Sequence, residues 1–221
     1  MRTYDDACAA AHALDLIGER WALLVVRELL LGPKRFTDLR AGLPNTSPNV
    51  LAQRLRELER AGVVQRRKLP PPAASRVYEL TDWGEELEPV ITQLGRWGAR
   101  SPLRPRGAGL SVDSLILSFR TMFDPGAADG LRASYELRLG EDRFRVVVAD
   151  GRFEIVRGAA DRPDASIETD AGTLAALVYD DCELAGALRS GDVKIEGDEL
   201  AVERFLELFP LPVPAPPAVG A

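Results

Sequence analysis

Residues 46–62 read TSPNVLAQRLRELERAG, and this stretch decides how the first half of the chain folds. Ser47 is a favoured N-cap, and Pro48 suits the first helical position because no backbone N–H is needed there. Apolar side chains then recur at helical spacing, which predicts a helix that runs to about Ala61 and stops at Gly62. The apolar stripe of this helix consists of Leu51, Leu55 and Leu58.

The opposite stripe of the same helix is polar. Residues placed at about 100° intervals bring amide and guanidinium side chains together there, and these groups hydrogen-bond base edges and phosphates. The polar stripe consists of Asn49, Gln53, Arg56 and Arg60, with Thr46 close by. Arg54 falls nearer the apolar stripe, and we expect it to pair with Glu57 or Glu28 instead.

The segments around this helix give the order helix, helix, short helix, capped helix, hairpin, long helix. Helical periodicity marks the helices, and alternation marks the two strands, whose joining loop holds three prolines. This order is typical of a winged helix-turn-helix, in which one helix enters the major groove of duplex DNA. The predicted elements are two helices within 7–31 broken at Gly18, a short helix at 35–41, strands at 63–69 and 76–80, and a long helix from Thr81 to about Ala99.

The charge distribution supports the same interpretation. The whole chain carries a net charge of −6, whereas residues 1–100 carry +2 and residues 101–221 carry −8. Residues 34–76 hold ten basic and three acidic side chains, and a local excess of this kind attracts the phosphates of nucleic acid. The predicted DNA-contacting residues are Arg35, Thr46, Ser47, Asn49, Gln53, Arg56, Arg60, Arg67, Lys68 and Arg76.

Several motifs in this half resemble those of the HxlR-type transcriptional regulators. They include ALDLIGERW at residues 13–21, LAQRLRELERAG at 51–62 and the terminal WG at 97–98, and the resemblance covers about residues 7–99. It implies a homodimeric, sequence-specific regulator that binds a double-stranded DNA operator and dimerises through its first and last helices. The habit of the family favours a repressor. The three prolines at 70–72 depart from the family pattern and leave the contacts of the hairpin open.

The second half of the chain changes class. Residues 101–110 are rich in proline, glycine and arginine, which is typical of a linker. One amphipathic helix follows, and then strands and helices succeed one another, with Asp150-Gly151 as a strong hairpin signal. This pattern predicts a mainly-α domain followed by an α+β domain with a five-stranded sheet. The predicted division is 1–100 for DNA binding and dimerisation, 101–110 for the linker, 111–209 for the α+β domain and 210–221 for a proline-rich, extended or disordered tail.

The order of motifs from Val146 to Phe209 resembles that of sterol-carrier-protein-like domains, with PDA at 163–165 and GDVKIEGD at 191–198. The resemblance implies an apolar tunnel, which beside a DNA-binding domain would sense a hydrophobic small-molecule effector. A filled core in a dimerisation or spacing module is the alternative, because an apolar pattern does not separate the two. The predicted lining consists of Phe144, Val146, Phe153, Ile155, Leu177, Leu188, Phe205 and Phe209.

The sequence predicts no catalytic site, no metal site, no cofactor and no membrane association. His12 is the only histidine, which excludes histidine-based triads and multi-histidine metal sites. No phosphate-binding loop is present, and no apolar run approaches the roughly 20 residues of a membrane span. The N-terminus lacks the pattern of a signal peptide. With only Cys8 and Cys182, no disulfide framework is expected, which indicates a cytoplasmic protein.

Two alternatives to an effector-sensing regulator stay open on the sequence alone. One is a lipid or small-molecule carrier whose N-terminal domain serves as a dimer scaffold. The other is a regulator that senses oxidants or electrophiles through Cys8, which precedes the first helix, where the helix dipole lowers a thiol pKa. Many HxlR-type regulators use a cysteine at this place. Asp5 and Asp6 oppose thiolate formation, and a half-buried structural cysteine is the competing interpretation.

Overall fold

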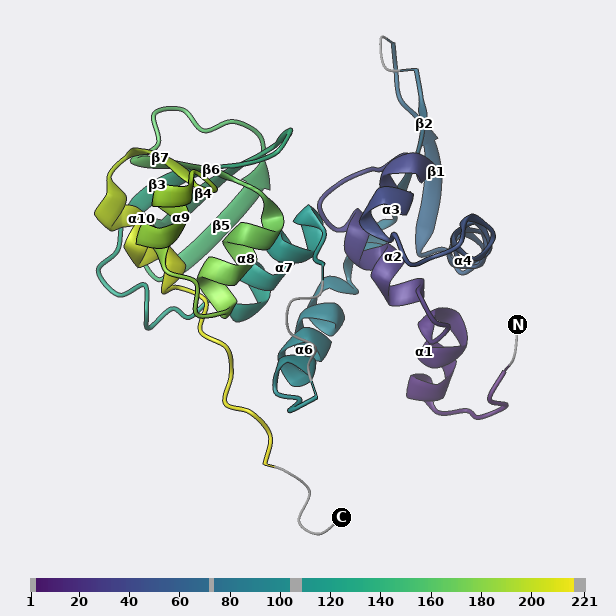
Figure 1. Cartoon of the computed structure of the whole chain (residues 1–221). Helices are drawn as coiled ribbons and strands as arrows, with labels where there is room; N and C mark the ends of the chain where they lie inside the picture. The colour runs from purple at the N-terminus through teal and green to yellow at the C-terminus, as the bar shows by residue number, and fades with distance from the viewer. Residues whose placement is uncertain (1–2, 72–73, 104–108, 217–221) are drawn as a thin grey trace. The chain divides into compact units, whose positions relative to one another are not determined.

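The computed structural model describes residues 3–71, 74–103 and 109–216, and the chain divides into two compact units (Figure 1). The first unit extends to Ile91 and the second begins at Thr92. This boundary falls inside a helix, and the expected linker at 101–110 stays a prediction, since residues 104–108 lie outside the described part. Among the described residues, no helix has both the length and the apolar character needed to span a bilayer.

The first unit consists of helices and a two-stranded hairpin, in the order that the sequence predicts (Figure 1). Its elements are α1 (Ala9–Ile17), α2 (Ala22–Leu29), α3 (Phe36–Gly42), α4 (Pro48–Arg60), β1 (Val64–Lys68), β2 (Arg76–Leu80) and α5 (Asp82–Glu85). The core forms where α2 packs on α4 and the hairpin: Val25 and Val26 of α2 and the leucine stripe of α4 are buried. Gly62 takes a φ of +75°, which ends α4 without the strain that a side chain would introduce.

The single long helix predicted after Thr81 is wrong, because α5 is followed by a separate helix, α6 (Glu88–Ala99). The cap itself is confirmed, since the hydroxyl of Thr81 accepts the N–H of Gly84 at 3.1 Å. The break has a local cause. Pro89 has no N–H to donate to the carbonyl of Glu85, as a continuous helix would require. α6 itself crosses the boundary between the two units.

The second unit is an α+β fold around a five-stranded sheet, as predicted. Its strands are β3 (Ala133–Leu139), β4 (Asp142–Ala149), β5 (Arg152–Arg157), β6 (Ala165–Thr169) and β7 (Lys194–Gly197), in the spatial order β5-β4-β3-β6-β7. β6 runs parallel to β3, and the other neighbouring pairs are antiparallel. Asp150 and Gly151 join β4 to β5 with φ values of 54° and 68°, the left-handed conformation that a tight hairpin turn needs.

Four helices lie over one face of this sheet (Figure 1). They are α7 (Val112–Met122), α8 (Ala171–Tyr179), α9 (Leu184–Ser190) and α10 (Glu199–Leu206). The core of the unit is aromatic. The ring of Phe119 on α7 stacks on Phe209 with centroids 4.4 Å apart, and Phe205 lies edge-on to both, at 5.7 and 5.2 Å. Rings at these distances are in contact, so they fill the space among themselves.

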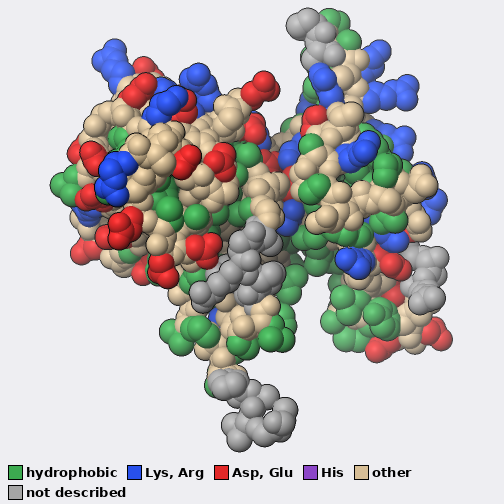
Figure 2. Space-filling view, viewed as in Figure 1, with side chains coloured by type: hydrophobic (Ala, Val, Ile, Leu, Met, Phe, Trp, Pro, Cys, Tyr) green, Lys and Arg blue, Asp and Glu red, His purple; other side chains and the backbone are tan. Residues whose placement is uncertain are grey.

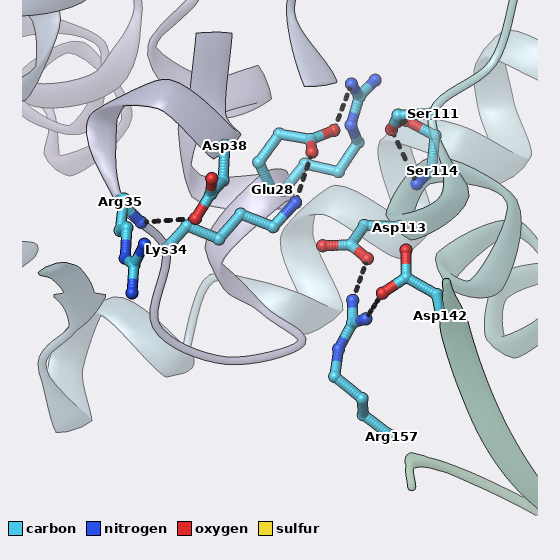
Figure 3. A network of polar contacts seen from close by, with 10 residues as sticks. Glu28, Lys34, Arg35, Asp38, Ser111, Asp113, Ser114, Asp142 and Arg157 are labelled. Carbon is cyan, nitrogen blue, oxygen red and sulfur yellow. Dashed lines mark hydrogen bonds and ion pairs between the residues drawn. The ribbon is translucent and has the colours of Figure 1, made fainter. Parts of the chain in front are cut away.

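A buried carboxylate joins three segments of the first unit. The Glu28 side chain on α2 is fully buried, and its oxygens accept hydrogen bonds from Arg27 at 2.9 Å and from Nζ of Lys34 at 2.8 Å (Figure 3). Lys34 also exchanges two backbone hydrogen bonds with Tyr78 of β2. Gly42, at the end of α3, leaves room for the carboxylate, since a Cβ there would lie 2.2 Å from Oε2 of Glu28. Because a buried charge is tolerated only when it is paired, these contacts fix how α2, α3 and the hairpin meet.

Gly42→Ala is expected to destabilise the first unit by about 1–3 kcal/mol, because the added methyl group displaces the Glu28 carboxylate from its partners. Urea unfolding followed by far-ultraviolet circular dichroism measures this change. Gly186→Ala on α9 is the matched control, because a Cβ at Gly186 would meet no atom within 4 Å. Its free energy of unfolding should stay unchanged or rise, since alanine favours helix. A Gly42→Ala variant as stable as the wild type would contradict the steric constraint.

Candidate nucleic-acid interface

The start of α4 is fixed by the cap that the sequence predicts. The hydroxyl oxygen of Ser47 accepts the N–H of Val50 at 3.3 Å, and Pro48 occupies the first helical position. Ser47 is exposed, but its hydroxyl is engaged in this cap. Since the leucine stripe is buried, α4 turns its opposite face to solvent. The exposed polar side chains of that face are Asn49, Gln53, Arg56 and Arg60.

Thr46 does not belong to this exposed face. The sequence places it beside the polar stripe, but only 4% of its surface is exposed and its hydroxyl is buried. The cause lies in the turn before α4, where the N–H of Thr46 donates to the carbonyl of Leu43 at 3.0 Å. This turn folds Thr46 inward. Thr46 is therefore removed from the DNA-contacting candidates and assigned to the packing of the turn.

Ion pairs divide the ten basic residues of 34–76 into two groups. Four have an acidic partner in the same unit: Lys34 with Glu28, Arg54 with Glu57, Arg66 with Glu59, and Arg67 with Glu79. The other six are exposed and form no ion pair with any residue in the described ranges; they are Arg35, Arg40, Arg56, Arg60, Lys68 and Arg76. These six guanidinium and ammonium groups are the basic side chains of residues 34–76 that remain available to phosphates.

Two ion pairs, Arg54 with Glu57 and Lys34 with Glu28, differ in whether the sequence predicts them. Arg54 pairs with Glu57, one of its two expected partners, and its side chain is only 11% exposed. The sequence alone does not reveal the pairing of Lys34 with Glu28, so a count of charges over residues 34–76 includes Lys34 among the cations that attract phosphates. The available signal was a lone acid within the apolar run of α2, which requires a cation once it is buried.

The remaining candidates for contact with DNA, Arg67, Lys68 and Arg76, lie on the β1–β2 hairpin. β1 and β2 pair in antiparallel register, with Lys68 opposite Arg76 at their far end. The guanidinium of Arg66 lies over the ring of Tyr78, 5.3 Å from its centroid, which holds this cation against the strand surface. Figure 2 shows Lys and Arg side chains gathered over the hairpin and α4. Of the three prolines in the connecting loop, Pro72 lies outside the described residues.

The comparison with known proteins bears on this surface. The sequence profile of the HxlR-like helix-turn-helix family matches residues 16–104. YvaP of Bacillus subtilis (strain 168), an uncharacterized HTH-type transcriptional regulator, is 42% identical over 85 residues, which are 38% of this chain and 79% of that protein. The chain belongs to the HxlR-like helix-turn-helix family. Its first unit is thus the DNA-binding domain of a helix-turn-helix regulator, as the sequence predicts.

A second HxlR-like relative is the HTH-type transcriptional regulator YodB of the same organism, which is 38% identical over 85 residues, covering 38% of this chain and 76% of YodB. The solved structure of reduced YodB aligns with 44% of this chain and 97% of its own, at 33% identity and a TM-score of 0.40. Both alignments involve less than half of this HxlR-like protein.

The second unit matches a different family. The sequence profile of the alkyl sulfatase C-terminal domain matches residues 108–215. The solved structure of the sec-alkyl sulfatase PisA1 aligns with 47% of this chain and 17% of its own, at 19% identity and a TM-score of 0.43. The five-stranded sheet is seen in the structure itself, whereas the sterol-carrier-like identity stays a prediction. Because the matching profile is named after an enzyme, the absence of catalysis also stays a prediction.

The eight residues predicted to line a tunnel contribute to the core of the second unit. Five are buried, and Phe153, Leu177 and Leu188 are half-buried. The rings of Phe153 and Phe209 lie edge to face with centroids 5.2 Å apart. The buried five are Phe144, Val146, Ile155, Phe205 and Phe209. A ligand cavity among these residues stays a prediction.

Cys8 is exposed, so the half-buried structural interpretation of this cysteine is wrong. It occupies the N-cap position of α1. The backbone N–H groups of Ala11 and Ala10 stabilise the thiolate and lower the pKa of the Cys8 thiol. The carboxylate of Asp6, which the sequence suggests would oppose the thiolate, accepts the backbone N–H of Cys8 at 2.8 Å. The start of α1 thus favours the reactive form of Cys8.

Alkylation of Cys8 by iodoacetamide should reach half of its maximal rate at a lower pH in the folded protein than in urea. The reason is that the lowered pKa depends on the N–H groups of an intact helix, which urea removes. Mass spectrometry of the Cys8 peptide across a pH series measures the rate, with the unfolded chain as its own control. Identical pH profiles in the two states would show that α1 does not activate the thiol.

Proposed function

We propose that this protein is a homodimeric repressor that binds a double-stranded DNA operator through α4 and the β1–β2 hairpin. The observation that carries the proposal is the set of six exposed basic side chains without ion pairs, within a chain of net charge −6. When an unpaired cation neutralises a phosphate, counterions leave the DNA, and their release favours binding. A cation that is already paired with a carboxylate contributes less to this binding free energy. The repressor role rests on the resemblance to the family alone.

The interface divides into groups that contact bases and groups that contact phosphates. Residues in the first half of a recognition helix reach base edges in the major groove, which assigns that role to Asn49, Gln53 and Arg56. Gln53 donates to Glu57 at 3.0 Å in the free protein and would exchange this bond for one to a base. Lys68 at the end of the hairpin is assigned to the phosphate backbone.

The proposed dimer uses exposed apolar side chains on α1 and α6. Leu14 on α1 is 50% exposed, and on α6 the exposed fractions are 48% for Val90, 49% for Leu94 and 74% for Trp97. The three α6 residues follow the spacing of one helical stripe. Large apolar side chains in such a stripe mark a protein interface, because leaving them in water is unfavourable.

The second unit is proposed to sense a small molecule with an apolar part. The family profile that matches this unit, over residues 108–215, is named after alkyl sulfatases. A carrier function with the first unit as a mere scaffold is less favoured, because a scaffold has no need of six unpaired cations on α3, α4 and the hairpin.

A thiol switch at Cys8 is a second candidate for the signal. It is favoured by the exposure of Cys8 and by the lowered pKa of its thiol at the start of α1, a helix that the proposed dimer uses. A modified Cys8 would alter the dimer and through it the spacing of the two DNA-binding surfaces. The alkylated protein should then lose operator affinity, and unchanged affinity would leave the effector as the only signal.

Arg56→Ala should weaken binding to operator DNA by about 1–3 kcal/mol, because a bidentate contact to a base is lost without a change in fold. Fluorescence anisotropy with a fragment from the promoter of its own gene measures the affinity, and genome-wide mapping of occupied sites supplies further fragments. Wild-type affinity should fall steeply as salt rises. Binding that ignores salt would exclude the proposed interface.

Two variants separate the roles of the cations. Lys68→Ala should reduce the slope of log affinity against log salt by about one, since it removes one phosphate contact. Arg189→Ala is the control, because Arg189 is an exposed arginine on α9, outside the proposed interface. It should leave both affinity and slope unchanged. Equal losses from Arg56→Ala and Arg189→Ala would point to a nonspecific charge effect.

Leu94→Asp should convert the dimer into a monomer, because it puts a charge into the apolar stripe of α6. Sedimentation velocity of the full chain measures the mass in solution. Leu200→Asp on α10 serves as its control, since Leu200 is 65% exposed but lies outside the stripe. A wild-type protein that sediments as a monomer, or a Leu94→Asp variant that stays dimeric, would exclude this interface.

A further inference from the structure

A groove of about 560 Å³ lies in the second unit, between the latter part of α6, the end of α7 and residues 210–213. This volume falls within the range of about 300–1,000 Å³ that is typical of small-molecule sites. Its lining combines an apolar side with a group of polar and charged side chains. The apolar side comprises Trp97, Met122, Phe123, Pro125, Leu211 and neighbouring prolines, and the polar groups are Gln93, Arg96, Arg100 and Asp124.

The walls of the groove are held by specific contacts. The backbone carbonyl of Arg100 accepts the N–H of Ala215 at 2.8 Å, and its Nε donates to the carbonyl of Val213 at 3.1 Å. On the other side, α6 lies close to α7 at Gly95, where a Cβ would come within 3.4 Å of Thr121. The prolines of the tail favour an extended chain, which runs beside α6 without folding into the space.

The charges in the groove favour an anion. Arg96 is exposed and forms no ion pair within the described ranges, and the terminal guanidinium nitrogens of Arg100 have no acidic partner there. Asp124 is the acid of the lining, and one of its oxygens accepts the N–H of Gly126 at 2.9 Å in a local turn. Two guanidinium groups beside an apolar surface stand out in the second unit, whose residues 92–221 hold 15 basic and 21 acidic side chains.

We propose that this groove binds a small amphiphilic organic anion, with an apolar or aromatic body and one carboxylate, sulfate or sulfonate group. The body packs on Trp97 and Phe123, and the acidic group pairs with Arg96 and Arg100. Phe123 also stacks on Phe153 at 5.2 Å, so the floor of the groove belongs to the aromatic core. This site rests on the proposed effector sensing and places the effector against α6 and not in the core.

α6 links the groove to the DNA-binding unit, because the same helix begins in that unit and lines the groove with its later turns. Ile91, in the first turn of α6, packs against the core of the first unit, and the turns that follow line the groove. Trp97 belongs both to the groove and to the exposed stripe assigned to the dimer. A ligand that contacts Trp97 therefore acts on the helix that also carries the proposed dimer contact.

Binding of anilinonaphthalene sulfonate to the full chain tests the site, with N-phenylnaphthylamine as a probe that has the same rings but no sulfonate. Dye fluorescence and quenching of tryptophan emission are both recorded. Arg96→Gln should weaken sulfonate binding by roughly threefold, and Arg96→Gln with Arg100→Gln by roughly tenfold, while the neutral probe changes by less than about twofold. Arg189→Gln, outside the groove, should bind both probes like the wild type.

A double variant that folds like the wild type by circular dichroism and keeps its affinity for the sulfonate would overturn the site. Equal weakening of both probes would overturn the pairing of the acidic group with the two arginines. Operator binding is measured on the same samples without either probe. A wild type that binds the sulfonate in the expected manner but binds no promoter fragment would refute the regulator function and still support the groove.

Discussion

The buried carboxylate of Glu28 is the constraint on which the first unit depends. A charge without access to water must be paired, and here the partners come from α2 itself and from Lys34, ahead of α3. Lys34 is also bonded to β2 through its backbone, so one ionised group sets the position of the helix-turn-helix and of the hairpin together. Gly42 makes room for the Glu28 carboxylate, because the carboxylate occupies the position where a side chain at residue 42 would lie.

Ion pairs with acidic side chains also determine which positive charges of the first unit are available for DNA. Counting basic residues over 34–76 overstates the attraction for phosphates, because four of the ten already have an acidic partner. What remains is a smaller set on α3, α4 and the far end of the hairpin, and this arrangement fits a helix in a major groove with a flanking backbone contact. Arginines in two different environments lie close together on α4: Arg54 pairs with Glu57, whereas Arg56 faces solvent.

α6 has three roles in this structure, and they involve both units of the chain. It begins against the core of the first unit, it presents an apolar stripe to solvent, and its later turns wall a groove in the second unit. The family profiles divide the chain between residues 104 and 108, while the compact units divide at residue 91. The two divisions differ because the family profiles depend on sequence similarity, whereas the compact units depend on which segments are in contact. The contacts in the second unit include Gly95 with Thr121 and the tail with Arg100.

Patterns among neighbouring residues are enough to predict most of the helices and strands, the fold class of each unit and the solvent-facing side of α4. These depend on local rules: a leucine every three or four residues, a serine cap before a proline, and an Asp-Gly turn between alternating strands. The tertiary structure alone decided the burial of Thr46, the partners of Lys34 and Arg67, and the groove. Each of these depends on segments far apart in the chain, such as residues 93–100 and 210–213, and periodicity carries no information about which distant surfaces meet. The break before Pro89 is the exception, since a local rule was present but the helical pattern on both sides concealed it.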